Sequence, residues 1–117
     1  MAMAPIDFDG AVPIDGYGPG FVRLGGQVYR GAMLILGGQV LPWGGLDDSK
    51  AVAALAGRAD LLLIGLGGEI GRAPPALLDA AEAAGLRTEV MVTPSAARSY
   101  NVLLSEGRRV AAALIPV

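Results

Sequence analysis

The chain has 117 residues, of which 53% are hydrophobic and 17% charged, and 9 Lys plus Arg against 11 Asp plus Glu give a formal net charge of -2. This length suits one domain with one hydrophobic core, and without a basic excess we expect no nucleic-acid partner. The sequence contains no cysteine and no histidine, which excludes disulfides, thiolate metal sites and histidine-based catalysis, so we expect no metal and no cofactor.

Residues 1–20 are rich in proline and glycine and are predicted to form an extended lead-in that packs on the domain through apolar residues such as Ile14 and Tyr17. Residues 1–10 carry Asp7 and Asp9 and no Lys or Arg, unlike a secretory signal or an organelle transit peptide. We therefore expect a bacterial cytoplasmic protein.

Two hairpins are predicted next, because a Gly-Gly pair separates residues 21–24 from 27–30, and another separates 33–36 from 39–41. The first 45 residues thus read as an antiparallel meander. Residues 31–46 are uncharged but are broken by glycines and Pro42, and they are fewer than the roughly 20 apolar residues of a membrane helix. We expect no membrane span.

Asp47-Asp48-Ser49 predicts the start of a short helix that ends before Gly57 or Asp60. The continuous apolar run 61–64 predicts a central parallel strand buried on both faces. Pro74-Pro75 then opens a helix with Leu77, Ala81 and Ala84 on its inner face and Gly85 at its end.

Residues 90–92 predict the next strand, followed by a helix with Thr93 as N-cap and Pro94 at its first position. A last strand is predicted over 110–115, and its short connection makes an antiparallel direction possible. The fold class is α/β: a three-layer domain with a central mixed, mostly parallel sheet flanked by helices and an added N-terminal β-meander. Residues 1–20 are the lead-in, and residues 21–117 are a single α/β domain.

A glycine-rich turn follows the first of these central strands, where a dinucleotide-binding loop would lie. Gly65, Gly67 and Gly71 have the spacing G-x-G-x-x-x-G, one residue longer than the dinucleotide fingerprint. The alternative is a turn that lets the chain leave a buried strand.

Polar residues gather at the start of the helix after residue 92. A helix N-terminus favours anions, and the carboxyl ends of neighbouring parallel strands collect ligands. One hypothesis is therefore a small anionic ligand or nucleotide between the Gly65 loop and the Thr93 helix start; its residues are Gly65, Gly67, Gly68, Thr93, Ser95, Arg98 and Asn101. The structural alternative is that Thr93 only caps the helix, Asn101 satisfies nearby backbone and Arg98 is solvated.

Trp43 lies in an apolar loop between the meander and the first helix. It is either a partner-binding residue at an interface, where tryptophan is enriched, or a plug at one end of the core.

Several motifs together resemble a family of small, mostly uncharacterised α/β proteins that includes the mitochondrial complex I assembly factor three. The similar residues are Ile14-Asp15, Tyr17, Trp43, Ile64-Gly65-Leu66-Gly67, Thr93-Pro94-Ser95-Ala96, Tyr100-Asn101, Leu103, Glu106-Gly107-Arg108 and residues 111–116. The resemblance implies a compact α/β fold, no established enzymatic activity and, for the mitochondrial relative, help with assembly through binding other proteins.

Together, the residue types and the resemblance favour binding over catalysis. We expect a non-enzymatic interaction or assembly-factor-like domain whose partners are other proteins, with a homodimer possible. The alternative is the small-ligand or nucleotide-binding protein described above.

Overall fold

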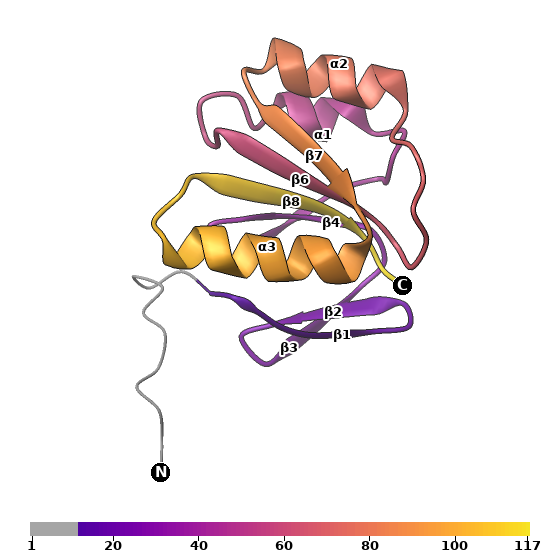
Figure 1. Cartoon of the computed structure of the whole chain (residues 1–117), viewed down its shortest axis with the longest axis vertical. Coiled ribbons are helices and arrows are strands. Elements are labelled where there is room, and N and C mark those ends of the chain that lie inside the picture. The colour runs from indigo at the N-terminus through magenta and orange to yellow at the C-terminus, as the bar shows by residue number, and fades with distance from the viewer. Residues whose placement is uncertain (1–11) are drawn as a thin grey trace.

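The computed structural model describes residues 12–117, which form eight strands and three helices (Figure 1). In chain order these are β1 (Ile14–Gly18), β2 (Phe21–Leu24), β3 (Gln27–Arg30), β4 (Met33–Leu36), β5 (Gln39–Pro42), α1 (Ser49–Ala53), β6 (Leu61–Leu66), α2 (Pro75–Ala83), β7 (Arg87–Met91), α3 (Thr93–Ser105) and β8 (Val110–Ile115). The first eleven residues of the predicted lead-in lie outside this description.

Both predicted hairpins are confirmed. β2 pairs with β3 and β4 with β5, and the four turn glycines Gly25, Gly26, Gly37 and Gly38 have φ between +56° and +83°. Two consecutive positive φ values characterise the tight turn whose twist matches antiparallel strands, and only glycine adopts them without strain. The turn residues therefore set the register of both hairpins.

The meander is not one added layer, which corrects the prediction. β1, β2 and β3 form a small three-stranded sheet, whereas β4 and β5 belong to a five-stranded sheet with the order β5-β4-β8-β6-β7. In β4, Met33, Leu34 and Ile35 are all buried, and a strand buried on both faces has to lie inside a covered sheet. Residues 14–18 of the predicted lead-in form β1, which pairs with β2. The predicted boundary between lead-in and domain at residue 20 therefore lies inside the small sheet.

The five-stranded sheet is mixed. β6 runs parallel to β7 and β8, while β4 runs antiparallel to β5 and β8. A mixed α/β fold is therefore confirmed, but "mostly parallel" is not, because parallel and antiparallel ladders are equal in number. β8 is antiparallel to β4, as considered from sequence, but parallel to its other neighbour, β6.

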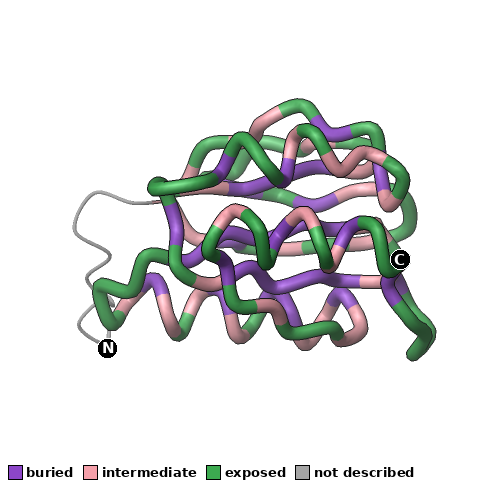
Figure 2. Tube along the Cα trace, turned by 90° about the horizontal axis from the view of Figure 1, so that it is seen from above, coloured by how far each residue is buried: buried purple, intermediate pink, exposed green. Residues whose placement is uncertain are grey.

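Apolar side chains from both faces of this sheet form the core. Leu62 and Ile64 of β6 pack with α1 and α2 on one face, and Leu63 packs with α3 and the small sheet on the other. Figure 2 shows the buried positions along the strands and the exposed positions on the outer sides of the helices. β6 is thus a central strand, as its apolar run predicts.

The predicted helix over residues 74–85 is confirmed as α2, with Leu77 and Ala81 buried and Gly85 at φ +81°. β7 begins at Arg87, before the predicted residue 90. β7 is an edge strand with exposed charged side chains, so an apolar run could not reveal its first half.

Candidate functional site

Thr93 connects three elements at the end of the sheet where β6 and β8 finish. Its hydroxyl accepts a hydrogen bond from the Gly67 N–H at 2.8 Å and donates one to the Ile115 carbonyl at 2.5 Å. Its own N–H donates to the Gly67 carbonyl at 2.8 Å. The N-cap of α3 is Val92, so Thr93 is not the predicted cap. It is fully buried and joins α3 to the ends of β6 and β8, and we call its three hydrogen bonds the Thr93 clasp.

Gly65 allows α3 to come this close to the sheet. A Cβ at position 65 would lie 2.8 Å from the Thr93 hydroxyl oxygen, 2.9 Å from Leu114 Cδ2 and 3.0 Å from Thr93 Cα. Gly67 has φ +86°, whereas Gly68 is exposed and has no neighbouring heavy atom where a Cβ would lie. The structure therefore explains why positions 65 and 67 are glycine, but it gives no such reason for Gly68.

Tyr100 and Asn101 of α3 bind two different hairpins. The Asn101 side chain accepts a hydrogen bond from the Ile14 N–H at 2.8 Å and donates one to the Ile14 carbonyl at 2.7 Å. The neighbouring Tyr100 hydroxyl accepts one from the Gly38 N–H at 3.2 Å, and its burial raises the pKa of Tyr100. Asn101 thus completes the backbone of β1, as the structural alternative held.

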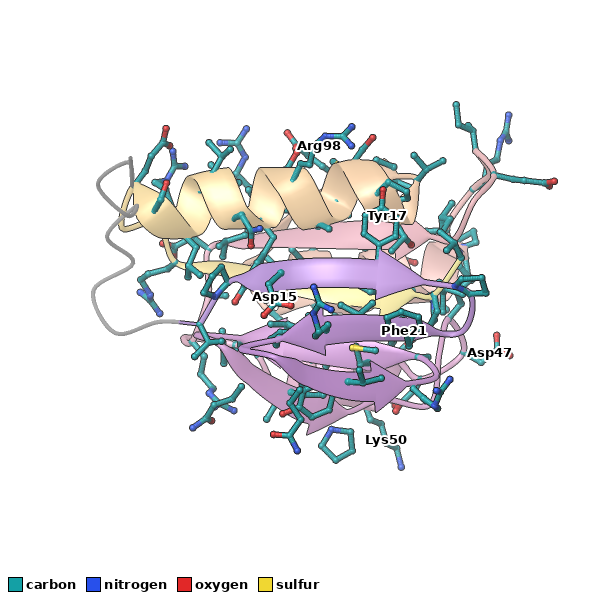
Figure 3. The ribbon with its side chains drawn as sticks, turned by 90° about the horizontal axis from the view of Figure 1, so that it is seen from below. Asp15, Tyr17, Phe21, Asp47, Lys50 and Arg98 are labelled. Carbon is teal, nitrogen blue, oxygen red and sulfur yellow. The ribbon has the colours of Figure 1, made fainter. Side chains whose placement is uncertain are left out.

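Arg98 lies on the outer side of α3, away from the small sheet (Figure 3). It donates a long 3.4 Å hydrogen bond to the Ser95 hydroxyl and, with Glu89, lines a surface hollow between α3 and β7.

The structure therefore brings together only some of the residues predicted for a ligand site. Thr93, Gly65 and Gly67 meet, but their polar groups bond to one another. Asn101 points to Ile14, and Arg98 lines a different surface. This arrangement does not support an anion held in the predicted crevice.

Trp43 is buried, with 7% of its surface exposed, in the cluster that contains Val52, Leu55 and Leu77. Its indole N–H donates to the Asp48 carbonyl at 3.0 Å. The structure thus places Trp43 as a plug of the core and not on the surface, where a partner would meet it.

Asp15 holds the small sheet together. Its carboxylate accepts hydrogen bonds from the Arg23 guanidinium and, at 2.6 Å, from the Gly26 N–H. The hydrogen bond from Arg23, reinforced by the one from Gly26, lowers the pKa of Asp15 below 3.8.

We predict that Asp15→Asn lowers the free energy of unfolding at neutral pH more than at acidic pH. A group with a lowered folded-state pKa contributes stability that is present above its unfolded pKa and is lost as pH falls through the folded value. Urea unfolding measured from neutral pH to below pH 3.8 should show the difference from the unmodified chain shrinking towards the acid end. Asp79→Asn on the exposed side of α2 is the control; a difference that stays constant with pH would contradict the prediction.

The loop between β6 and α2 carries a feature that the sequence analysis missed. Residues 68–72 are all exposed, and Ile70 is 90% exposed. Beside it lies a hollow of about 360 Å³ lined by Gly71, Arg72, Ala73, Pro75, Leu78 and Val90. The sequence does place an isoleucine between glycines and charged residues, a pattern that indicates an exposed apolar side chain. The glycine spacing of the same segment was instead interpreted as a possible nucleotide-binding loop.

Within residues 12–117 there is no group of three or more carboxylates or other side chains that could hold a metal ion. In the same part of the chain, no helix has the length and apolar character to cross a membrane.

The sequence is similar to a protein family and to several known proteins. A family model described as a protein of unknown function (DUF498/DUF598) matches residues 14–115. An uncharacterised protein of Rhodobacter capsulatus is 56% identical over 117 residues, which cover 98% of this chain and 94% of that protein. NADH dehydrogenase (ubiquinone) 1 alpha subcomplex assembly factor 3 of Mus musculus is 34% identical, over 99% of this chain but 66% of that protein.

Among solved structures, the crystal structure of an outer membrane protein from Bartonella henselae superposes with a TM-score of 0.81. The two chains are 32% identical, and the match covers 95% of this chain and 99% of that one. The architecture described above is therefore shared across nearly the whole length of both chains.

Proposed function

The chain belongs to the family of proteins of unknown function DUF498/DUF598, and on that premise we propose that it is a non-enzymatic, assembly-factor-like domain that binds another protein. The resemblance that was visible in the sequence motifs is confirmed by this membership.

The relationship to the assembly factors supports a protein partner. The mouse relative is, by name, an assembly factor, and the match covers 99% of this chain. The same match covers only 66% of the mouse protein, so the proposal is a protein partner in general and not the particular partner of the mouse protein.

The exposed Ile70 is the observation that carries the proposal. Fully burying an isoleucine side chain stabilises by about 1.5–3 kcal/mol, so an isoleucine that is 90% exposed on a loop of exposed residues is a ready anchor for a partner. The adjacent hollow, lined in part by Pro75, Leu78 and Val90, offers an apolar surface against which a partner side chain can pack. Thr93, in contrast, already has its hydroxyl engaged as donor and acceptor, which favours a structural role over a catalytic one.

We predict that Ile70→Ser weakens partner binding at least about tenfold, since losing about 1.5 kcal/mol of apolar burial corresponds to that factor. The tagged chain and the variant are compared by affinity purification from the native host with quantitative mass spectrometry. The partner identified in this way is then titrated against both purified proteins.

Val28→Ser is the matched control, because Val28 is 46% exposed on the small sheet, away from this loop. The free energy of unfolding of both variants should lie within about 0.5 kcal/mol of that of the unmodified chain, as is usual for surface substitutions. Equal losses for the two variants, or none for either, would remove the Ile70 loop from the proposal.

A further inference from the structure

β7 leaves one side of its backbone open. It is the last strand of the five-stranded sheet, and within residues 12–117 it pairs only with β6. The Arg87 N–H donates to the Asp60 carbonyl at 2.9 Å, on the β6 side. Because backbone groups alternate along a strand, the peptide groups of Thr88 and Val90 point outward. An open row of this kind is a template for another strand.

We propose that a second copy of this chain pairs with this edge, β7 against β7 and antiparallel, so that the two five-stranded sheets become one. This inference goes beyond the proposed function and does not depend on it, because Arg87 and Glu89 neither belong to the Ile70 loop nor line the hollow beside it. Val90 of β7 does line that hollow, so the variants that test the dimer are placed at Arg87 and Glu89.

Hydrogen bonding allows three registers for this pairing within β7 (Arg87–Met91). Outward-pointing residues have to face one another, so the facing pair is Thr88 with Thr88, Thr88 with Val90, or Val90 with Val90 of the second copy. The second register sets Glu89 against Glu89, which is unfavourable. The first sets Arg87 against Glu89 of the second copy, twice, by symmetry. The third sets Glu89 against Met91 and forms no charge pair. Opposite charges at directly facing positions stabilise a strand pair by about 0.2–1 kcal/mol each, so charge favours the first register over the other two.

The surfaces on either side of β7 suit such a dimer. Between β7 and α3 lie two hollows of about 310 and 460 Å³, and Glu89 and Leu103 line both. Val102, which also lines the larger hollow, is 55% exposed, and Val90 is 38% exposed on β7 itself. In the part of the chain that the structure describes, neither Arg87 nor Glu89 forms a salt bridge. Apolar side chains and unpaired charges therefore flank the strand that the second copy would cover.

Charge reversal tests this register on the full chain by sedimentation velocity. The unmodified chain should form a dimer, and Arg87→Glu or Glu89→Arg alone should raise the dimer dissociation constant at least about tenfold, because each sets like charges opposite one another twice. An equimolar mixture of the two variants should form a heterodimer, visible by its mass in native mass spectrometry, since every Glu then faces an Arg. Arg30→Glu, on the small sheet, is the control and should leave the dimer unchanged.

Three results would overturn the proposal. The unmodified chain could remain monomeric at all concentrations, in which case Arg87 and Glu89 only protect the edge from association. The single reversals could leave the dimer intact, or the mixed variants could fail to associate. A loss of partner binding in Ile70→Ser with an unchanged dimer would leave this inference standing, so the two proposals can fail separately.

Discussion

Replacing Thr93 with valine is expected to lower the free energy of unfolding by about 2–5 kcal/mol. Valine has nearly the shape of threonine but has no hydroxyl, so the Gly67 N–H loses its acceptor and the Ile115 carbonyl loses a donor. A buried backbone group left without its partner costs about 1–3 kcal/mol. The hydrogen bond of the Gly67 N–H is buried and that of the Ile115 carbonyl is part-buried, so the carbonyl contributes the smaller share. Both groups lie where β6 and β8 end against α3, so the loss is expected to be shared by three elements.

Urea denaturation at neutral pH measures this effect through the midpoint of unfolding. Thr93→Ser is the matched control: it keeps the hydroxyl and removes one methyl group, which costs about 1 kcal/mol. If valine proved as stable as serine, the hydroxyl would not be the clasp that the geometry indicates.

Replacing Gly65 with alanine is expected to destabilise the protein by about 1–3 kcal/mol, the usual range for overpacking a closed site. The new methyl group would lie within 3.0 Å of Thr93 Cα. The Leu114 methyl group can rotate away, but the backbone of α3 cannot move without loosening the Thr93 hydrogen bonds. We expect this substitution to shift α3 relative to β6.

Gly68→Ala is the matched control within the same loop, because a Cβ at position 68 meets no heavy atom within 4 Å and Gly68 is not among the residues with positive φ. It should remain within about 0.5 kcal/mol of the unmodified chain. Equal costs at the two positions would mean that the loop, and not the close approach of Thr93, demands glycine.

Thr93→Val and Gly65→Ala also distinguish the two interpretations of the glycine-rich loop, as a ligand-binding loop or as a structural turn. A ligand-binding loop would lose ligand-dependent stabilisation in the variants, whereas the clasp loses stability with no ligand added. The structure brings the Gly65 loop and the Thr93 helix start together, where the sequence placed a hypothetical ligand site. The reason for their proximity is a hydrogen-bonded contact within the chain.

Local signals in the sequence were sufficient for much of the fold. The Gly-Gly pairs specify both hairpins because consecutive positive φ values are a property of the turn residues themselves. The apolar run of β6 and the helical spacing of Leu77 and Ala81 likewise indicate their own burial. The family motifs, spread over residues 14–116, identified the protein's relatives.

Contacts between distant residues decided the rest. The two neighbours Tyr100 and Asn101 bind backbone groups 62 and 87 residues away, and no local pattern can show which backbone a side chain will reach. The same holds for β4, which joins the main sheet through β8 near the end of the chain, and for Trp43, which burial assigns to the core. Thus the sequence alone established that this is a histidine- and cysteine-free α/β protein with two glycine-turned hairpins. Only the tertiary structure decided that Thr93 joins α3 to the ends of β6 and β8, that Ile70 is exposed and that β7 lies at the edge of its sheet. The reason is that burial and strand pairing are properties of the whole packed chain.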